Sequence, residues 1–233
     1  LKAAREYFPG RKILTIWQPH TYSRTQSLLD EFSTAFGDAD EVIITDIFEA
    51  RESFTGFGID QVMEAVQHPA LHHLGTNSDV ADYLMRHLKP GDEVLVFDPV
   101  DFLFQTSMRN AGATVRMFPT RLEEDGISLK GLEEYITPKT RMIGFCNPHN
   151  PMGMLYKRQE LEYLLDLSDK YGFYIMNDEI WSDINYPGNE FISLNSFGPE
   201  RNRRTLTVYG FSKSFGIAGL RVGAVWAMNQ ENY

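Results

Sequence analysis

Two basic residues near the end of the chain could anchor an aromatic aldehyde cofactor that carries a phosphate. Lys213 lies in YGFSKSFGIAGLRVG (209–223), just after a strand-like run. An amine placed there can form a Schiff base with an aldehyde and later move protons. Arg221 follows eight residues later, and its guanidinium could neutralise a phosphate with a fork of donors. Such a cofactor would serve as an electron sink.

Asp178 and Asn150 each stand at the end of another strand-like run. Asp178 ends YGFYIMND (171–178), at the edge where open α/β sheets place their ligands, and its carboxylate could keep a pyridinium nitrogen protonated. Asn150, in CNPHNPMG (146–153), could donate its amide to a phenolic oxygen. Taken singly, such residues are more often surface, capping or turn residues. Their order at three strand ends favours one shared pyridine ring.

The elements that must position these residues alternate between strand-like and amphipathic helical runs. This alternation predicts an α/β fold, with a mostly parallel sheet and flanking helices. Expected helices are a stretch around 28–36 that stops at Gly37, one from Asn77 or Ser78 to about Leu88, and one around 161–165 that ends at Gly172. Expected strands are 11–17, 41–47, 70–74, 93–97, 114–118, 141–146, 171–178, 205–211 and 223–228.

Composition excludes several classes of function. The 233 residues are 42% hydrophobic, which suits a globular core, and carry a net charge of −10, which argues against a nucleic-acid surface. No apolar run approaches the roughly 20 residues of a membrane span. Cys146 is the single cysteine, which suits a reducing compartment, so we expect a cytoplasmic protein. The histidines show no metal-ligand spacing, so no metal is expected.

The motifs of the second part resemble those of class I/II aminotransferases, the fold-type I pyridoxal 5′-phosphate (PLP) enzymes, over about residues 92–233. The resemblance implies that Lys213 forms the Schiff base with PLP and that Arg221 binds its phosphate. It also implies that Asp178 binds the ring nitrogen and that Asn150 contacts the phenolic oxygen. An amino-acid substrate and a homodimer are implied in the same way.

Two positions depart from the family's usual pattern. Trp181 stands where the family often has a tyrosine that donates to the phenolic oxygen, and an indole N–H can still donate a hydrogen bond. Gly210 stands where the family often has a phosphate-binding serine, which leaves the nearby Ser212 as a candidate ligand.

The first part resembles a different family, the C-terminal domain of UDP-N-acetylmuramate–L-alanine ligase, a Mur ligase of peptidoglycan synthesis. The resemblance is carried by REYFPGRKILTIWQPHTYSRT (5–25), ADEVIITDIFEARE (39–52) and HLKPGDEVL (87–95). It implies that His20 and Arg24 lie near the nucleotide-sugar and amino-acid substrates. Asp46 begins the family's DIY-type segment, with Phe48 in place of tyrosine.

The two resemblances meet in KPGDEVL (89–95), which indicates a chimera or fused fragment. We expect a Mur-ligase-like α/β domain over 1–90 and part of an aminotransferase large domain over 91–233, which keeps strand 93–97 in its own sheet. The expected function is that of a PLP-dependent aminotransferase, incomplete in this chain. The alternatives are a ligase fragment, although no GxxxxGK[ST] loop for ATP occurs, a non-catalytic fusion, and a PLP carbon–sulfur β-lyase.

Overall fold

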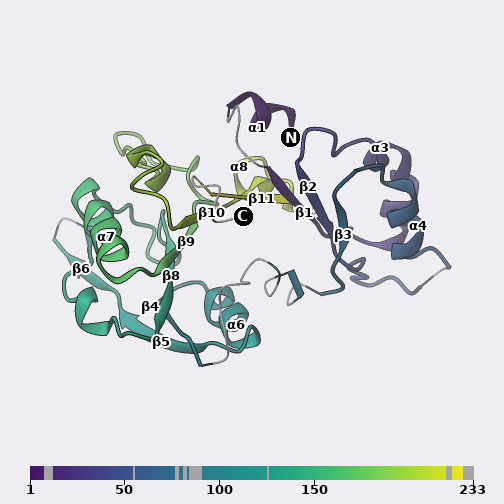
Figure 1. Cartoon of the computed structure of the whole chain (residues 1–233). Helices are drawn as coiled ribbons and strands as arrows, with labels where there is room; N and C mark the ends of the chain where they lie inside the picture. Colours follow the sequence, from purple (N-terminus) through teal and green to yellow (C-terminus); the bar gives the residue numbers. More distant parts are fainter. Residues whose placement is uncertain are drawn as a thin grey trace. The chain divides into compact units, whose positions relative to one another are not determined.

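The computed structural model describes residues 1–7, 13–54, 56–76, 79–80, 83, 91–124, 126–218 and 222–227. Its chain divides into two compact units, drawn in Figure 1. Unit 1 comprises Leu1–Tyr83 and Tyr209–Trp226, and unit 2 comprises Leu84–Val208 and Ala227–Tyr233. The segment that carries Lys213 therefore groups with the first part of the chain, whereas the expected division at residue 90 assigns it to the second.

Unit 2 is built on parallel strands in the order β10-β9-β8-β4-β5. The strands are β4 (Glu93–Asp98), β5 (Thr114–Pro119), β8 (Thr140–Cys146), β9 (Tyr174–Asp178) and the start of β10 (Thr205–Gly210). Four successive residues of β4, from Val94 to Phe97, are buried, as is typical of a parallel strand covered on both faces. Strand 93–97 thus pairs with two strands of the second part, β5 and β8. Because the strands are parallel, their carboxyl ends share one edge.

Helices connect these strands and cover the sheet. α6 (Phe102–Asn110) lies between β4 and β5, and α7 (Arg158–Tyr171) lies between β8 and β9. Unit 2 also contains two 3-10 helices, η1 (Leu132–Tyr135) and η2 (Leu194–Phe197). A hairpin of β6 (Arg121–Glu123) and β7 (Gly126–Ser128) completes the described elements of this unit. α6 approaches β8 closely at Gly144, where a Cβ atom would lie 2.6 Å from Phe104 Cδ1. A glycine is needed there because no larger residue leaves room for that ring.

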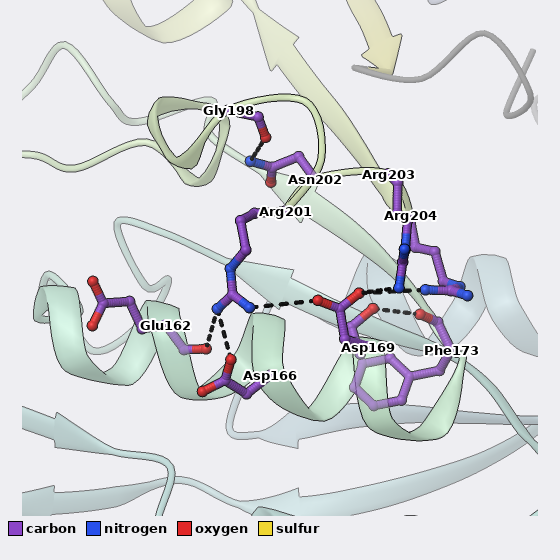
Figure 2. Close-up of polar contacts among 10 residues, drawn as sticks. Glu162, Asp166, Asp169, Phe173, Gly198, Arg201, Asn202, Arg203 and Arg204 are labelled. Carbon is purple, nitrogen blue, oxygen red and sulfur yellow. Dashed lines mark hydrogen bonds and ion pairs between the residues drawn. The ribbon is translucent and has the colours of Figure 1, made fainter.

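The loop before β10 is tied to α7 by ion pairs, as Figure 2 shows. Arg201 Nη2 lies 2.7 Å from Asp166 Oδ1, and Arg201 Nη1 lies 3.4 Å from Asp169 Oδ2. The other carboxylate oxygen of Asp169 lies 2.9 Å from Arg203 Nη2 and 3.5 Å from Arg204 Nη1. One partly buried carboxylate thus holds three arginines, which fixes the entry of the chain into β10.

The strands of unit 1 lie in the order β3-β2-β1-β11. β1 (Leu14–Trp17), β2 (Glu41–Ile44) and β3 (Leu71–His73) are parallel, and β11 (Val222–Ala227) runs antiparallel to β1. The helices are α1 (Lys2–Tyr7), α2 (Tyr22–Ser27), α3 (Leu29–Ser33), α4 (Ile59–Ala65) and α8 (Phe211–Ser214). Its core packs Trp17 against Phe32 and Phe36, at centroid distances of 4.5 and 5.4 Å.

The α/β class with a mostly parallel sheet is confirmed, and so is a strand in each of the nine expected places. The strand expected from residue 171 begins at Tyr174, because α7 continues to Tyr171 and Gly172 caps it in the left-handed region at φ 76°. The helix expected around 28–36 ends at Ser33. Residues 11–12 and most of the helix expected from residue 77 to 88 lie outside the described residues.

Several described elements were not expected from the sequence, namely α4, α6, α8, η1, η2 and the β6–β7 hairpin. Across the part of the chain that the structure describes, no helix combines the length and the apolar character that crossing a membrane requires.

Candidate functional site

Polar residues gather at the carboxyl ends of β4, β8 and β9 in unit 2. Asp101 follows β4, Asn150 follows β8, and Asp178 ends β9. The side-chain Nδ2 of Asn150 donates a hydrogen bond to Asp101 Oδ2 over 3.0 Å. The charge of Asp101 also acts on Asp178, whose pKa it helps to raise. The sheet thus brings together two of the predicted cofactor residues, Asn150 and Asp178, with Asp101 interacting with both.

Asp178 is a largely buried carboxyl with one described donor. Its Oδ1 accepts a hydrogen bond from the backbone N–H of Ile180 over 2.9 Å, and its other oxygen has no donor among the described residues. Burial is the main reason why the pKa of Asp178 rises from 3.8 to about 6, with a smaller contribution from Asp101. A cation that paired with this carboxylate would offset the loss of hydration.

The loop that presents Asn150 is anchored by the buried side chain of Asn147. The backbone N–H of Asn147 donates to the carbonyl of Asp178 over 2.9 Å. Its Nδ2 donates to the carbonyl of Ile192 over 3.1 Å, and its Oδ1 accepts from the N–H of Tyr156 over 3.2 Å. These bonds fix the turn because they use both ends of the amide.

His149, beside Asn150, is buried, and neither of its ring nitrogens has a hydrogen-bond partner among the described residues. Burial lowers the pKa of its imidazole to about 4. The ring is therefore neutral at physiological pH and is packed against Phe97 and Tyr156, at centroid distances of 6.1 and 6.0 Å. This histidine contributes ring contacts to the packing of the loop.

A cleft of about 820 Å³ adjoins this loop. Asn150 and Trp181 both line it, together with Lys157, Tyr186 and Glu190. Asp101 and Asp178 do not line it, so the cleft meets the carboxylate cluster at Asn150 and does not enclose it. Trp181 therefore lines the same cleft as Asn150.

Directly after Asp178, Glu179 forms a buried network that holds the end of β9. Its carboxylate accepts from Asn177 Nδ2 over 2.8 Å, from Ser193 Oγ over 2.9 Å and from the N–H of Leu194 over 3.1 Å. Burial raises the pKa of Glu179 in spite of these donors. The network fixes the direction of the chain on both sides of Asp178.

The remaining predicted cofactor residues belong to unit 1. Ser212 and Lys213 lie in α8, directly after β10, and the Lys213 side chain is exposed within the chain. Gly210 is the N-cap residue of this short helix. Arg221 lies outside the described residues.

The ligase-like residues lie at the carboxyl ends of β1, β2 and β3 in the same unit. His20 pairs with Phe48 in an isolated β-bridge, and their rings lie 5.3 Å apart. Arg24 is part of α2. Asp46 Oδ1 lies 2.8 Å from His73 Nε2. Within the described ranges, no group of three or more His, Cys, Asp or Glu side chains is arranged to hold a metal.

The reasoning from sequence missed Asp101, Asn147 and Glu179. Asp101 had a signal available, because it follows strand 93–97 as Asn150 follows strand 141–146. The roles of Asn147 and Glu179 depend on partners 45 and 14 residues away, and no local pattern marks such partners.

Open α/β sheets bind their ligands at the carboxyl ends of their strands, which is the edge where the Asn150 amide and the Asp178 carboxylate lie. The sequence profile described as "Aminotransferase class I and II" matches residues 73–232. The chain belongs to this family. The match begins before residue 92, where the resemblance was expected to start.

Individual relatives agree with this family and add a second one. The chain is 35% identical to an aspartate aminotransferase of Thermotoga maritima over 150 residues, which are 64% of this chain and 39% of that protein. It is 46% identical to the UDP-N-acetylmuramate–L-alanine ligase of Gloeobacter violaceus over 98 residues, which are 41% of this chain and 21% of that one. The second match supports the interpretation of a chimera. The chain spans less than half the length of the curated aminotransferases that it matches.

Among solved structures, cystalysin from Treponema denticola is similar, with a TM-score of 0.61 and 26% identity over 66% of this chain and 40% of that one. That crystal structure contains PLP. The family and its solved members confirm PLP as the cofactor predicted from the sequence. The described residues fit this group, since Asp178 has an oxygen without a described donor and Asn150 has a second N–H to donate.

Proposed function

We propose that the aminotransferase-like part of this chain binds PLP and catalyses amino-group transfer on an amino acid. The observation that carries the proposal is the largely buried carboxylate of Asp178, which ends β9 at the same sheet edge as the amide of Asn150, in a chain of the aminotransferase family. PLP supplies an electron sink when it is bound. Asp178 would hold the proton on its ring nitrogen, and Asn150 would donate to its phenolic oxygen.

Lys213 is assigned the covalent role because of its place in the family's motif. It lies in the short helix α8, directly after β10, with Ser212 next to it as a candidate phosphate ligand. Arg221 is assigned to the phosphate on its position in the sequence alone. Trp181, on the cleft side of Asn150, would donate its indole N–H at the rim of the site.

Covalent labelling tests the assignment of Lys213. The chain is incubated with PLP, reduced with borohydride and digested, and the modified lysine is located by mass spectrometry. We expect label on Lys213 and none in Lys213→Ala, while the matched control Lys130→Ala, at another exposed lysine, keeps the label. Labelling spread over surface lysines, or equal labelling of Lys213→Ala, would refute the proposal.

Spectroscopic titration tests the assignment of Asp178. Removal of the carboxylate should weaken PLP binding at least about tenfold, because a charged hydrogen bond in a buried site contributes roughly 1.5–3 kcal/mol. Asp178→Asn keeps the size of the side chain and removes its charge. An unchanged affinity in this variant would remove Asp178 from the site.

The amino-acid substrate, the dimer and the cytoplasmic location belong to the same proposal. Aminotransferase relatives act, by their names, on substrates as different as aspartate and aromatic amino acids, so the substrate class is an amino acid with no side chain assigned. A panel of amino acids with 2-oxoglutarate as acceptor tests turnover, and sedimentation tests the dimer. A carbon–sulfur β-lyase would instead release pyruvate from a cysteine conjugate in the same panel.

A second candidate function concerns the first part of the chain. We infer from the 46% identity to the ligase of Gloeobacter violaceus that residues 1–90 descend from a Mur ligase C-terminal domain that binds a nucleotide-sugar precursor. His20 and Arg24 would contact the precursor. Calorimetry with UDP-N-acetylmuramate tests the idea, and binding that persists in His20→Ala and Arg24→Ala would refute these roles. A chain that binds neither PLP nor the precursor would be a non-catalytic fusion.

A further inference from the structure

Both carboxylate oxygens of Asp101, at the carboxyl edge of the unit 2 sheet, accept hydrogen bonds. Its Oδ2 accepts a hydrogen bond from Asn150 Nδ2 over 3.0 Å, and its Oδ1 accepts one from the backbone N–H of Leu103 over 3.0 Å. The second bond caps the nine-residue helix α6. Because each oxygen has its own donor, the carboxylate cannot rotate without breaking a hydrogen bond.

The partner of Asp101 is Asn150, and the orientation of its amide decides whether it can donate to the phenolic oxygen of PLP. The amide of Asn150 ends in an oxygen that only accepts and a nitrogen that only donates. A carboxylate only accepts hydrogen bonds, so the bond to Asp101 requires that the nitrogen of Asn150 faces it. The second N–H on the same nitrogen is then directed by the plane of the amide and stays available for another acceptor.

We propose that Asp101 is a further residue of the cofactor site, a positioning residue that fixes which end of the Asn150 amide meets PLP. The inference rests on the proposed function. An amide rotated by a half-turn would present its carbonyl oxygen to the phenolic oxygen of PLP, and two acceptors repel each other. Asp101 prevents this rotation because only the nitrogen of Asn150 can bond to it.

Two substitutions separate orientation from helix capping. Asp101→Asn keeps the size of the side chain and the oxygen that caps α6, but turns an N–H donor toward Asn150, which bonds the oxygen end of that amide. Asp101→Ser keeps a capping hydroxyl and removes the carboxylate. Asp98→Asn is the matched control, since it changes an exposed carboxylate at the end of the same strand. Circular dichroism checks that each variant is folded.

The first measurement uses the chain without cofactor. In nitrogen-15 spectra the side-chain N–H₂ pair of Asn150, assigned by its loss in Asn150→Ala, should show one proton shifted by the bond to a carboxylate. We expect this signal to move in Asp101→Asn and Asp101→Ser and to stay in place in Asp98→Asn. A signal that is unchanged in both Asp101 variants would overturn the inference.

The second measurement is a double-mutant cycle on PLP affinity. Loss of the orienting bond should weaken PLP binding about five- to tenfold in either Asp101 variant, as expected for one hydrogen bond. In the Asn150→Ala background the same substitutions should have almost no further effect, because a positioning residue acts through its partner. Equal losses in both backgrounds would overturn the inference and leave the proposed function standing. No binding of PLP by the wild-type chain would overturn both.

Discussion

The amide of Asn150 donates to the carboxylate of Asp101 over 3.0 Å, although 49 residues separate them in the sequence. β4 and β8 are neighbours in a parallel sheet, so the residues that follow them are delivered to the same edge. β9 pairs with β8 on its other side and adds Asp178 to that edge. The direction of three strands is therefore what assembles the cluster.

Replacement of Asp178 by asparagine is expected to stabilise the cofactor-free chain at neutral and alkaline pH. The pKa of this carboxyl is raised from 3.8 to about 6 by burial. Between these values the folded chain binds more protons than the unfolded chain, so its stability falls as the pH rises through this window and stays low above it. We expect a gain of about 1–3 kcal/mol from Asp178→Asn at pH 8, measured by urea unfolding.

The control for this substitution is the pH dependence of the free energy of unfolding. Asp178→Asn should lose the decline in stability between about pH 4 and 6 that this carboxyl causes in the wild type. Asp98→Asn removes an exposed carboxylate, and this variant should still show the decline in stability. A wild-type profile in the Asp178→Asn chain would contradict the shifted pKa.

Glu179→Ala should destabilise unit 2 strongly. The substitution leaves the donors on Asn177, Ser193 and Leu194 without the carboxylate that they share. Buried donors that lose their acceptor cost about 1–3 kcal/mol each, and we expect a total loss of roughly 2–4 kcal/mol in urea unfolding. Glu179→Gln keeps one acceptor oxygen and should lose less, whereas Glu190→Ala, at an exposed position, should change little. Equal stability of Glu179→Ala and Glu190→Ala would show that the hydrogen bonds to Glu179 do not stabilise unit 2.

Gly144→Ala should destabilise the packing of α6 on the sheet. The new methyl group would lie 2.6 Å from Phe104 Cδ1 and 3.3 Å from Val96 Cγ1. Overpacking of this kind costs about 1–3 kcal/mol, measurable as a lower unfolding midpoint. Phe104→Leu should recover part of that loss in the double variant, since the smaller side chain vacates the space. Gly37→Ala is the control, because nothing lies within 4 Å of its added Cβ. Similar losses in the two alanine variants would contradict the steric explanation.

Asp169→Ala should weaken the attachment of the loop before β10, which Figure 2 shows, more than Asp166→Ala does. Asp169 pairs with Arg201, Arg203 and Arg204, whereas Asp166 pairs with Arg201 and its side chain is 64% exposed. We expect a loss of about 1 kcal/mol for Asp169→Ala and a few tenths for Asp166→Ala, because exposed pairs contribute little. Both effects should shrink in 1 M salt. A larger loss in Asp166→Ala would reverse this ranking.

The sequence was sufficient to predict the nine strands of the main sheet and the family. Runs such as VLVF (94–97) and MIGFC (142–146) are continuously apolar because both faces of a parallel strand are covered, and this pattern is visible without a structure. Gly172 marked the end of a helix for a comparable local reason, as a residue that adopts a positive φ. The motifs around Asn150, Asp178 and Lys213 indicated the family that the comparisons confirm.

Local patterns determined which residues form strands and which groups stand at strand ends, because hydrophobic period and turn residues act over a few positions. Tertiary structure decided that Asp101 contacts Asn150, that Glu179 is buried among donors from Ser193 and Leu194, and that residues 209–226 group with the first part of the chain. These relationships depend on which strands become neighbours and on how deeply each carboxyl is buried. Pairing and burial are properties of the folded chain as a whole, so no window of the sequence contains them.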